Sequence, residues 1–240
     1  MSGVLLIARR ELFAYLRSPL GAAIIAGALL VDGIWFYWQG LTQKLLSAEV
    51  LQQFLYGASG ATMVAALFLS MRLFAEERQT GTLVLLNTSP LRDWQIVAGK
   101  YLSALSVVVL LTVLTAYMPA LILVNGKVSI GHVLVGYSGL ILLGSASIAI
   151  GIFGSALARS QVVAIIVSAA ILVPLVLLWA VARSVDPPLN RFLSALALHH
   201  DNFRPFMFGR LEFGPIVYYL AMTYFFLLAS TKVLEARRWR

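Results

Sequence analysis

The sequence predicts an all-α polytopic membrane protein with six transmembrane helices and an amphipathic helix at its N-terminus. Of its 240 residues, 60% are hydrophobic and only 12% are charged, and the mean hydropathy is +0.89. Soluble domains contain about 25% charged residues, so this chain has too few to cover the surface of a water-soluble globule. The sequence contains no cysteine, which excludes disulfides, thiolate nucleophiles and Cys-ligated metal centres.

Six charge-poor windows supply the predicted spans. Each window lies between flanking charged residues and holds 19 to 31 residues, and Asp32 is the only charged residue inside any of them. About 20 residues of helix cover the roughly 30 Å hydrocarbon core of a bilayer, so each window can cross the membrane once and none can cross it twice. The predicted spans are 19–38, 54–74, 101–124, 133–157, 162–182 and 214–233.

The basic residues predict the orientation of these spans. An even number of spans places both termini on one side, which carries twelve basic and five acidic residues, a charge of +7. The other side carries six basic and five acidic residues, a charge of +1. The excess of Lys and Arg predicts that both termini are cytoplasmic. The net charge of +8 therefore indicates membrane topology, and we expect no nucleic-acid partner.

Residues 1–18 are predicted to form a cytoplasmic amphipathic helix that lies in the membrane interface. At about 100° per residue, most of its apolar side chains share one arc. Ser18 and Pro19 then end this helix and begin the first span. The helix serves either as a positively charged anchor or as a specific docking element. The charged residues that occupy its other face are Arg9, Arg10, Glu11 and Arg17.

Residues 75–100 form a long cytoplasmic loop between the second and third spans. Span two is expected to continue into a charged turn at 76–78, and Gly81 permits a break there. Thr82 can cap a short apolar helix over 83–86, and Ser89 with Pro90 can start the next helix. An apolar helix below the membrane needs something to pack against. The charged flank favours a protein partner over the lipid interface.

This loop resembles that of the membrane subunits of type 2 ABC transporters. The shared pattern is an acidic pair, an Arg, a Gly-Thr pair, a short apolar helix, a Ser-Pro pair and a Gly-Lys pair that enters a helix. The residues 8–12 and 15–19 are similar to the amphipathic start of that family. Residues 200–203 with Tyr218 and Tyr219 resemble its gliding-motility-type branch. The loop residues that carry the pattern are Glu76, Glu77, Arg78, Gly81, Thr82, Ser89, Pro90, Gly99 and Lys100.

The resemblance implies that the chain is the permease half of an exporter in the bacterial cytoplasmic (inner) membrane. Two such chains, copies or paralogues, would form the pathway in the lipid bilayer, and each would dock an ABC ATPase subunit through a coupling helix in the loop 75–100. The implied docking residues are Glu76, Glu77, Arg78, Thr80, Gly81 and Thr82, with Arg9, Arg10 and Glu11 as secondary contacts.

The same resemblance bears on nucleotide binding and on the outer surface. The chain lacks the Gly-rich loop that cradles phosphates, so we expect no cofactor in it, and ATP and Mg would be bound by the partner ATPase. In related permeases the region equivalent to the extracytoplasmic loop 183–213 forms short re-entrant helices in the outer half of the membrane. An amphipathic interfacial loop is the alternative. The substrate is not specified by any pattern in the sequence.

Three other functional hypotheses follow from the residues. Ser59 lies in a Gly-x-Ser-Gly pattern, and with His132 it would suit a rhomboid-like intramembrane serine protease, although small residues in a span more often serve close packing. His199, His200 and Asp201 would suit zinc or copper, but adjacent residues seldom point to one ion, so we expect no metal site. The third hypothesis is a structural anchor of a motility or envelope machine.

Isolated polar and proline residues inside the spans give further expectations. Asp32 is either a pathway residue near the outer end or an interfacial residue beside Trp35, and the interfacial interpretation is preferred. Pro119 and Pro174 are expected to kink spans three and five. Small residues give span four a face for close packing, either within one chain or across a dimer.

Overall fold

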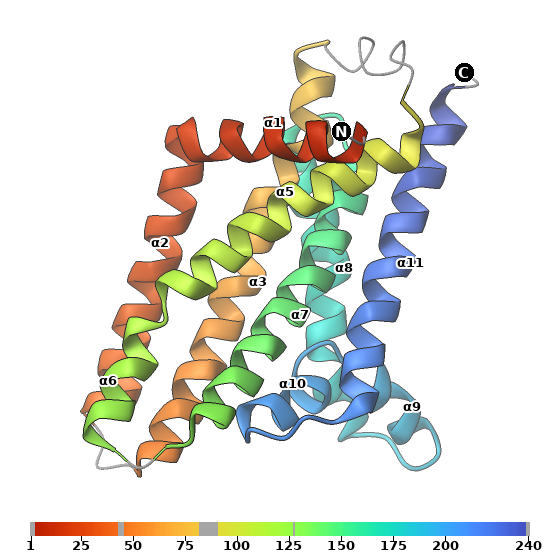
Figure 1. The fold of residues 1–240 in the computed structure, drawn as a ribbon. Coiled ribbons are helices and arrows are strands. Elements are labelled where there is room, and N and C mark those ends of the chain that lie inside the picture. The colour runs from red at the N-terminus through yellow and green to blue at the C-terminus, as the bar shows by residue number, and fades with distance from the viewer. Residues whose placement is uncertain (1–2, 43–45, 82–90, 127, 239–240) are drawn as a thin grey trace.

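The computed structural model describes residues 3–42, 46–81, 91–126 and 128–238, and the described chain folds into helices (Figure 1). The predicted coupling helix at 83–86 and Thr82 lie outside these residues. In chain order the helices are α1 (Gly3–Arg17), α2 (Pro19–Trp35), the π-helix η1 (Phe36–Leu41), α3 (Ser47–Gln79), α5 (Asp93–Leu114), α6 (Tyr117–Asn125), α7 (Ile130–Leu157), α8 (Gln161–Ala182), α9 (Leu189–Leu196), α10 (His200–Met207) and α11 (Phe213–Arg238).

Within the part of the chain that the structure describes, six helical segments are long and apolar enough to cross a membrane, which confirms the predicted fold class of an all-α polytopic membrane protein. Each overlaps one predicted span, and several are longer. The second is the most extended, because α3 continues as one 33-residue helix through the charged turn to Gln79. The six segments are Pro19–Gly40, Ser47–Gln79, Asp93–Val124, Ile130–Leu157, Gln161–Ala182 and Phe213–Ala236.

The centre of the bundle is α7, which packs against α3, α5, α8 and α11. Its small residues permit this close approach. A Cβ atom added at Gly151 would overlap Ser70 of α3, and one added at Gly154 would overlap Ser168 of α8. The predicted small-residue face of span four therefore serves packing within one chain.

Proline has different effects in the third and fifth spans. The third span is interrupted between α5 and α6, at Thr115 and Ala116. Pro119 explains this break because a proline ring clashes with the carbonyl group four residues earlier, which belongs to Thr115. In the fifth span, Pro174 lies inside α8, which continues without interruption to Ala182.

Two short helices, α9 and α10, lie between α8 and α11 at the end of the bundle that also holds α6 (Figure 1). The backbone N–H of Leu198 donates to the carbonyl of Leu175 in α8 at 2.9 Å. Leu175 precedes the end of α8 by seven residues, so the chain returns about 10 Å along that helix. Phe203 and Phe206 of α10 are fully buried, as expected for a segment that folds back into the bundle.

The opposite end of the bundle carries both termini. Helix α1 lies across this end, and α11 finishes at the same end (Figure 1). The turn between α1 and α2 is made by Ser18, whose backbone is extended and whose hydroxyl accepts a hydrogen bond from the N–H of Gly21. Pro19 then occupies the first position of α2, where its lack of an N–H costs nothing.

Candidate functional site

Charged side chains from α1, α3 and α5 meet where α1 crosses the end of the bundle. The ammonium group of Lys100 in α5 donates to Glu77 Oε1 at 2.7 Å, to Glu11 Oε1 at 3.3 Å and to the carbonyl of Leu73 at 2.6 Å. The guanidinium of Arg10 contacts the same Glu11 oxygen at 2.6 Å and the same Glu77 oxygen at 3.2 Å. We call Arg10, Glu11, Glu77 and Lys100 the charge cluster.

The electrostatics of the charge cluster are those of a paired, partly buried site. Lys100 is 1% exposed, and an unpaired ammonium group at that depth would be strongly unfavourable. Two carboxylates and two cations balance in formal charge. Burial alone would raise the pKa of Glu11, but the charge of Lys100 and the contacts with Arg10 hold that pKa below its ordinary value. The hydrogen bond with Glu11 raises the pKa of Arg10, so both groups are ionised.

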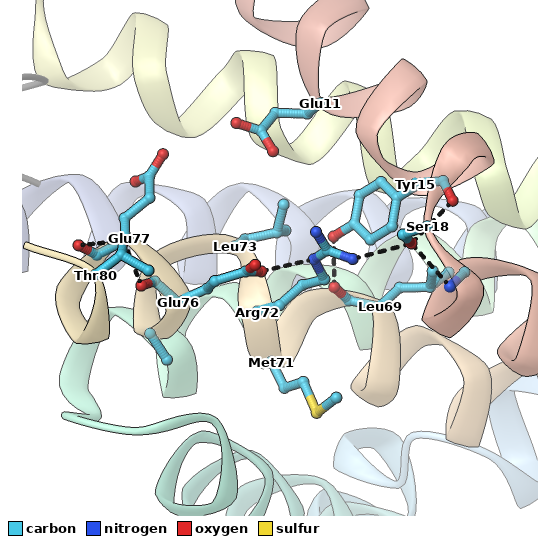
Figure 2. Close-up of polar contacts among 12 residues, drawn as sticks. Glu11, Tyr15, Ser18, Leu69, Met71, Arg72, Leu73, Glu76, Glu77 and Thr80 are labelled. Carbon is cyan, nitrogen blue, oxygen red and sulfur yellow. Dashed lines mark hydrogen bonds and ion pairs between the residues drawn. The ribbon is translucent and has the colours of Figure 1, made fainter. Parts of the chain in front are cut away.

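A second set of contacts fixes the α1–α2 turn to α3 (Figure 2). The Tyr15 hydroxyl donates to the carbonyl of Leu69 at 2.5 Å, and the Arg72 guanidinium lies 5.0 Å from the centre of the Tyr15 ring. Arg72 also donates to the Ser18 hydroxyl at 3.2 Å and forms an ion pair with Glu76 at 2.8 Å. The same helix that contributes Glu77 to the charge cluster is therefore held against α1 over about two turns.

A third set of contacts joins α3 to the end of α7. Arg78 donates to the carbonyls of Ala156 at 2.7 Å and Ala158 at 2.5 Å, which are among the last carbonyls of α7 and have no partner within the helix. The Ser155 hydroxyl accepts from the backbone N–H of Phe74 at 3.1 Å. The C-terminal end of α3 is consequently bonded to α1, α5 and α7.

The structure divides the docking residues implied by the resemblance into two groups. Glu77, Arg78 and Glu11 point into the bundle and make the internal contacts described above. The second group lies at the surface: Glu76, Thr80 and Gly81 at the end of α3, and Arg9 and Arg10 on α1. Gly81 has φ +73, a left-handed conformation that glycine adopts without strain.

Two residues of this site, Lys100 and Arg72, are not predicted from the sequence to be functional side chains. Lys100 was noted as part of a Gly-Lys pair, and its ion pairs with α1 and α3 were not anticipated. Arg72 falls inside the predicted span 54–74 and its ion pair is not predicted there, although its spacing of four residues from Glu76 is the spacing of a helical ion pair. Gly99 has a packing role, because a Cβ atom there would overlap Ile7 of α1.

Asp32 lies away from this site, near the other end of α2. Its side chain is 3% exposed, and its Oδ1 atom has no hydrogen-bond partner among the residues that the structure describes. Asp32 faces the interior of the chain, which disfavours the preferred interpretation of an interfacial carboxylate. Its role along a pathway stays a prediction.

The residues behind the protease and metal hypotheses have other partners. Ser59 Oγ lies 2.6 Å from Nε2 of His199, whereas His132 Nε2 contacts the carbonyl of Met207 at 2.7 Å. Ser59 also donates to the carbonyl of Tyr56, so its proton is directed away from His199. His200 stacks on Trp179. Within the described residues, no group of three or more His, Asp or Glu side chains is placed to hold a metal.

Comparison with known proteins gives one family match. The family described as ABC-2 family transporter protein matches residues 24–232. This range begins within α2, ends within α11 and includes the whole segment between α3 and α5. No curated protein matches the chain. The match identifies the type 2 ABC transporter family without distinguishing the gliding-motility-type branch.

Proposed function

Since the chain belongs to the ABC-2 family of transporter proteins, we propose that it is the membrane-spanning permease subunit of an ATP-binding cassette exporter. It works with a second permease, a copy or a paralogue, in the bacterial cytoplasmic membrane. Separate ATPase subunits drive it from the side that carries both termini. The observation that supports this most directly is the bonding of the cytoplasmic end of α3 to three other helices.

Helix α3 is suited to transmit movement from an ATPase. Its 33 residues form one helix about 50 Å long, which exceeds the thickness of the hydrocarbon core and lets its end project into the cytoplasm. A force applied near Thr80 and Gly81 therefore acts on a span directly. Transmission between sites requires contiguous, rigid contacts, and the charge cluster provides them by joining α3 to α1 and α5.

The charge cluster also fixes both ends of the loop between α3 and α5. Glu77 precedes Gly81 by one helical turn, and Lys100 lies about two turns into α5, which begins at Asp93. The two side chains are 2.7 Å apart. The end of α3 and the first turns of α5 are thus held together at this point. An ATPase that acts on either helix end would move α3, α5 and α1 together.

The surroundings of Gly99 and Lys100 are unlike those of a phosphate-binding loop, which supports the proposal that a partner chain binds the nucleotide. Gly99 lies inside α5 against Ile7, and the ammonium group of Lys100 is already bonded to two carboxylates and a carbonyl. A phosphate-binding lysine instead needs free access and a cradle of backbone N–H groups. This environment supports the proposal that the ATPase binds ATP and Mg, while this chain supplies the docking surface and the pathway.

The docking proposal is tested by copurification with a matched pair of variants. Thr80→Arg places a bulky charge at the exposed end of α3, and Ser184→Arg places the same charge at an exposed position between α8 and α9. We expect the wild type and Ser184→Arg to retain an ATPase in mild detergent and Thr80→Arg to lose most of it. Equal retention by all three proteins would contradict docking at the end of α3, and absence of any ATPase would contradict the permease.

A second measurement separates a transporter from a structural anchor. Because the chain has no cysteine, Thr80→Cys provides one spin-labelling site per copy. In a reconstituted complex of two permeases and the ATPase, an exporter should show a distance between the two labels that changes on addition of MgATP. A structural anchor would show a distance that ATP does not alter.

A further inference from the structure

A groove runs along the outer surface of the bundle between α2 and α3. It has a volume of about 660 Å³, and its lining is almost wholly apolar. On α2 it extends from Leu20 to Trp35, and on α3 from Phe68 to Tyr56. Fifteen residues of helix correspond to about 22 Å, so the groove follows most of the hydrocarbon thickness. The proposed function does not use this feature.

Glycine keeps the groove open on both of its walls. Gly27 of α2 and Gly60 of α3 line it, and a Cβ atom added to either would meet no atom within 4 Å. At the outer end the rings of Trp35 and Tyr56 lie 6.1 Å apart, and the Trp35 indole is fixed by a hydrogen bond to the carbonyl of Gln53 at 2.9 Å. The groove is thus bounded at the outer end and open along its length.

The dimensions of the groove decide which occupant fits. Its volume divided by its length gives a cross-section on the order of 30 Å². An α-helix is about 10 Å in diameter and needs roughly 80 Å². An extended methylene chain, whose carbon atoms pack at about 4 Å, needs roughly a quarter of that area. One hydrocarbon chain fills this groove, whereas a helix of a second copy would not enter it.

An exposed basic residue lies in the chain next to the other end of the groove. Arg17 is three residues before Leu20 and is exposed. Arg72, one turn beyond Phe68 in α3, is already bonded to Ser18 and Glu76 and its side chain is 16% exposed, so it is not available to a phosphate. Guanidinium groups bind phosphate well. By the orientation that the basic residues predict, this end lies at the headgroup level of the cytoplasmic leaflet.

We propose that the groove between α2 and α3 binds one acyl chain of a phospholipid from the cytoplasmic leaflet, with the lipid phosphate at Arg17. The apolar lining and the length match the chain, and the basic end matches the headgroup. The Trp35 and Tyr56 rings limit how far the chain reaches.

Native mass spectrometry of the full chain, extracted from membranes of defined phosphatidylglycerol and phosphatidylethanolamine content, tests this proposal. Gly27→Leu and Gly60→Leu fill the groove, and leucine favours helix more than glycine does. Gly214→Leu is the matched control, because Gly214 in α11 also has no atom near an added Cβ. We expect the wild type and Gly214→Leu to retain one phospholipid per chain and the groove variants to lose it at least severalfold. Equal retention in all four proteins would overturn the proposal.

A fluorescent label inside the groove gives an independent measurement of lipid binding that does not require a variant that fills the groove. A fluorophore on Gly60→Cys, in a chain with no other thiol, should be quenched severalfold more by phospholipids brominated along the acyl chain than the same fluorophore on Ser184→Cys. Equal quenching at the two positions would overturn the proposal. So would efficient disulfide formation between two Gly60→Cys chains, because it would assign the groove to a second copy.

Discussion

His199 is buried among aromatic rings at the end of the bundle formed by α9 and α10. Its ring stacks on Phe203 with centroids 5.3 Å apart and meets the edge of Tyr56 at 5.4 Å, and its Nε2 contacts Ser59. Burial lowers the pKa of His199 from 6.5 to about 4, with a smaller contribution from the neighbouring His200. The imidazole is therefore neutral in the folded protein at neutral pH.

Acid should destabilise the protein through this residue. Between pH 6.5 and about 4 the unfolded chain binds a proton at His199 that the folded chain does not, so the free energy of unfolding falls as pH falls. The change at this one group is on the order of 3 kcal/mol. Thermal melting of the protein in detergent should show a lower melting temperature at pH 4.5 than at pH 7.5. His199→Gln, which keeps a donor for Ser59, should reduce this dependence, and His132→Gln should retain it.

The same acid sensitivity in His199→Gln as in the wild type would assign the effect to other groups. Carboxylates such as Glu11, whose pKa is lowered, lose their stabilising contribution only as pH falls below their ordinary value near 4.5 and through the lowered one. The interval from pH 6.5 to 5 therefore separates the histidine from the carboxylates.

Individual residues show how far a motif can predict a site. The pattern around residues 76–78 points to the end of α3 as the docking site, which stays a prediction. It did not indicate which side chains face inward, because successive helical residues point about 100° apart and only the neighbouring helices decide which direction is buried. Glu77 meets Lys100, and Arg78 meets the carbonyls of α7. Both contacts join residues far apart in the sequence, and without the fold no local pattern reveals them.

At the level of elements, the charge cluster holds α1, α3 and α5 together through one buried ammonium group. Lys100→Met would leave Glu11 and Glu77 close together without their central cation. Removing one partner of a buried pair costs about 3–5 kcal/mol. The double variant Lys100→Met, Glu77→Gln should cost less than the single one, because one of the two carboxylates is then neutral. A double-mutant cycle of unfolding free energies measures this coupling.

An exposed ion pair serves as the control for that cycle. Lys232 pairs with Glu235 at 2.7 Å on α11, with 67% of the lysine side chain exposed, and surface pairs contribute little. Lys232→Met should therefore change stability far less than Lys100→Met. Strict additivity of the Lys100 and Glu77 substitutions would show that the cluster does not act as a unit.

The elements differ in how well the sequence predicts them. Apolar length predicts all six spans, because the bilayer thickness sets a minimum that short helices do not reach. Pro119 predicts a distortion of the third span, and the structure places the break at Thr115, where the displaced carbonyl lies. The π-helix Phe36–Leu41 was not predicted, because its residues are equally compatible with a continuing α-helix and only packing selects the wider turn.

At the scale of the whole molecule, the helices form an inner and an outer set. Most residues in the membrane-spanning parts of α3 and α7 are buried within the chain, whereas fewer than a third are buried in those of α2, α8 and α11. Exposed apolar surface is unfavourable in water and acceptable against lipid or another apolar helix. The sequence predicts the total apolar content correctly, but it does not assign each span to a set, because every span is apolar around its full circumference.

The orientation of the bundle is the prediction that concerns the molecule as a whole. The ends of α1 and α11 lie on one side and the α8–α9 segment on the other (Figure 1), and the excess of basic residues assigns the first side to the cytoplasm. In this cysteine-free chain, Ser184→Cys should react with a membrane-impermeant maleimide in spheroplasts. Thr80→Cys should react only after the membrane is permeabilised. Both positions are exposed in the structure, so both should react equally in detergent. Labelling of Thr80→Cys but not of Ser184→Cys in intact spheroplasts would show the opposite topology, in which the end of α3 could not reach a cytoplasmic ATPase.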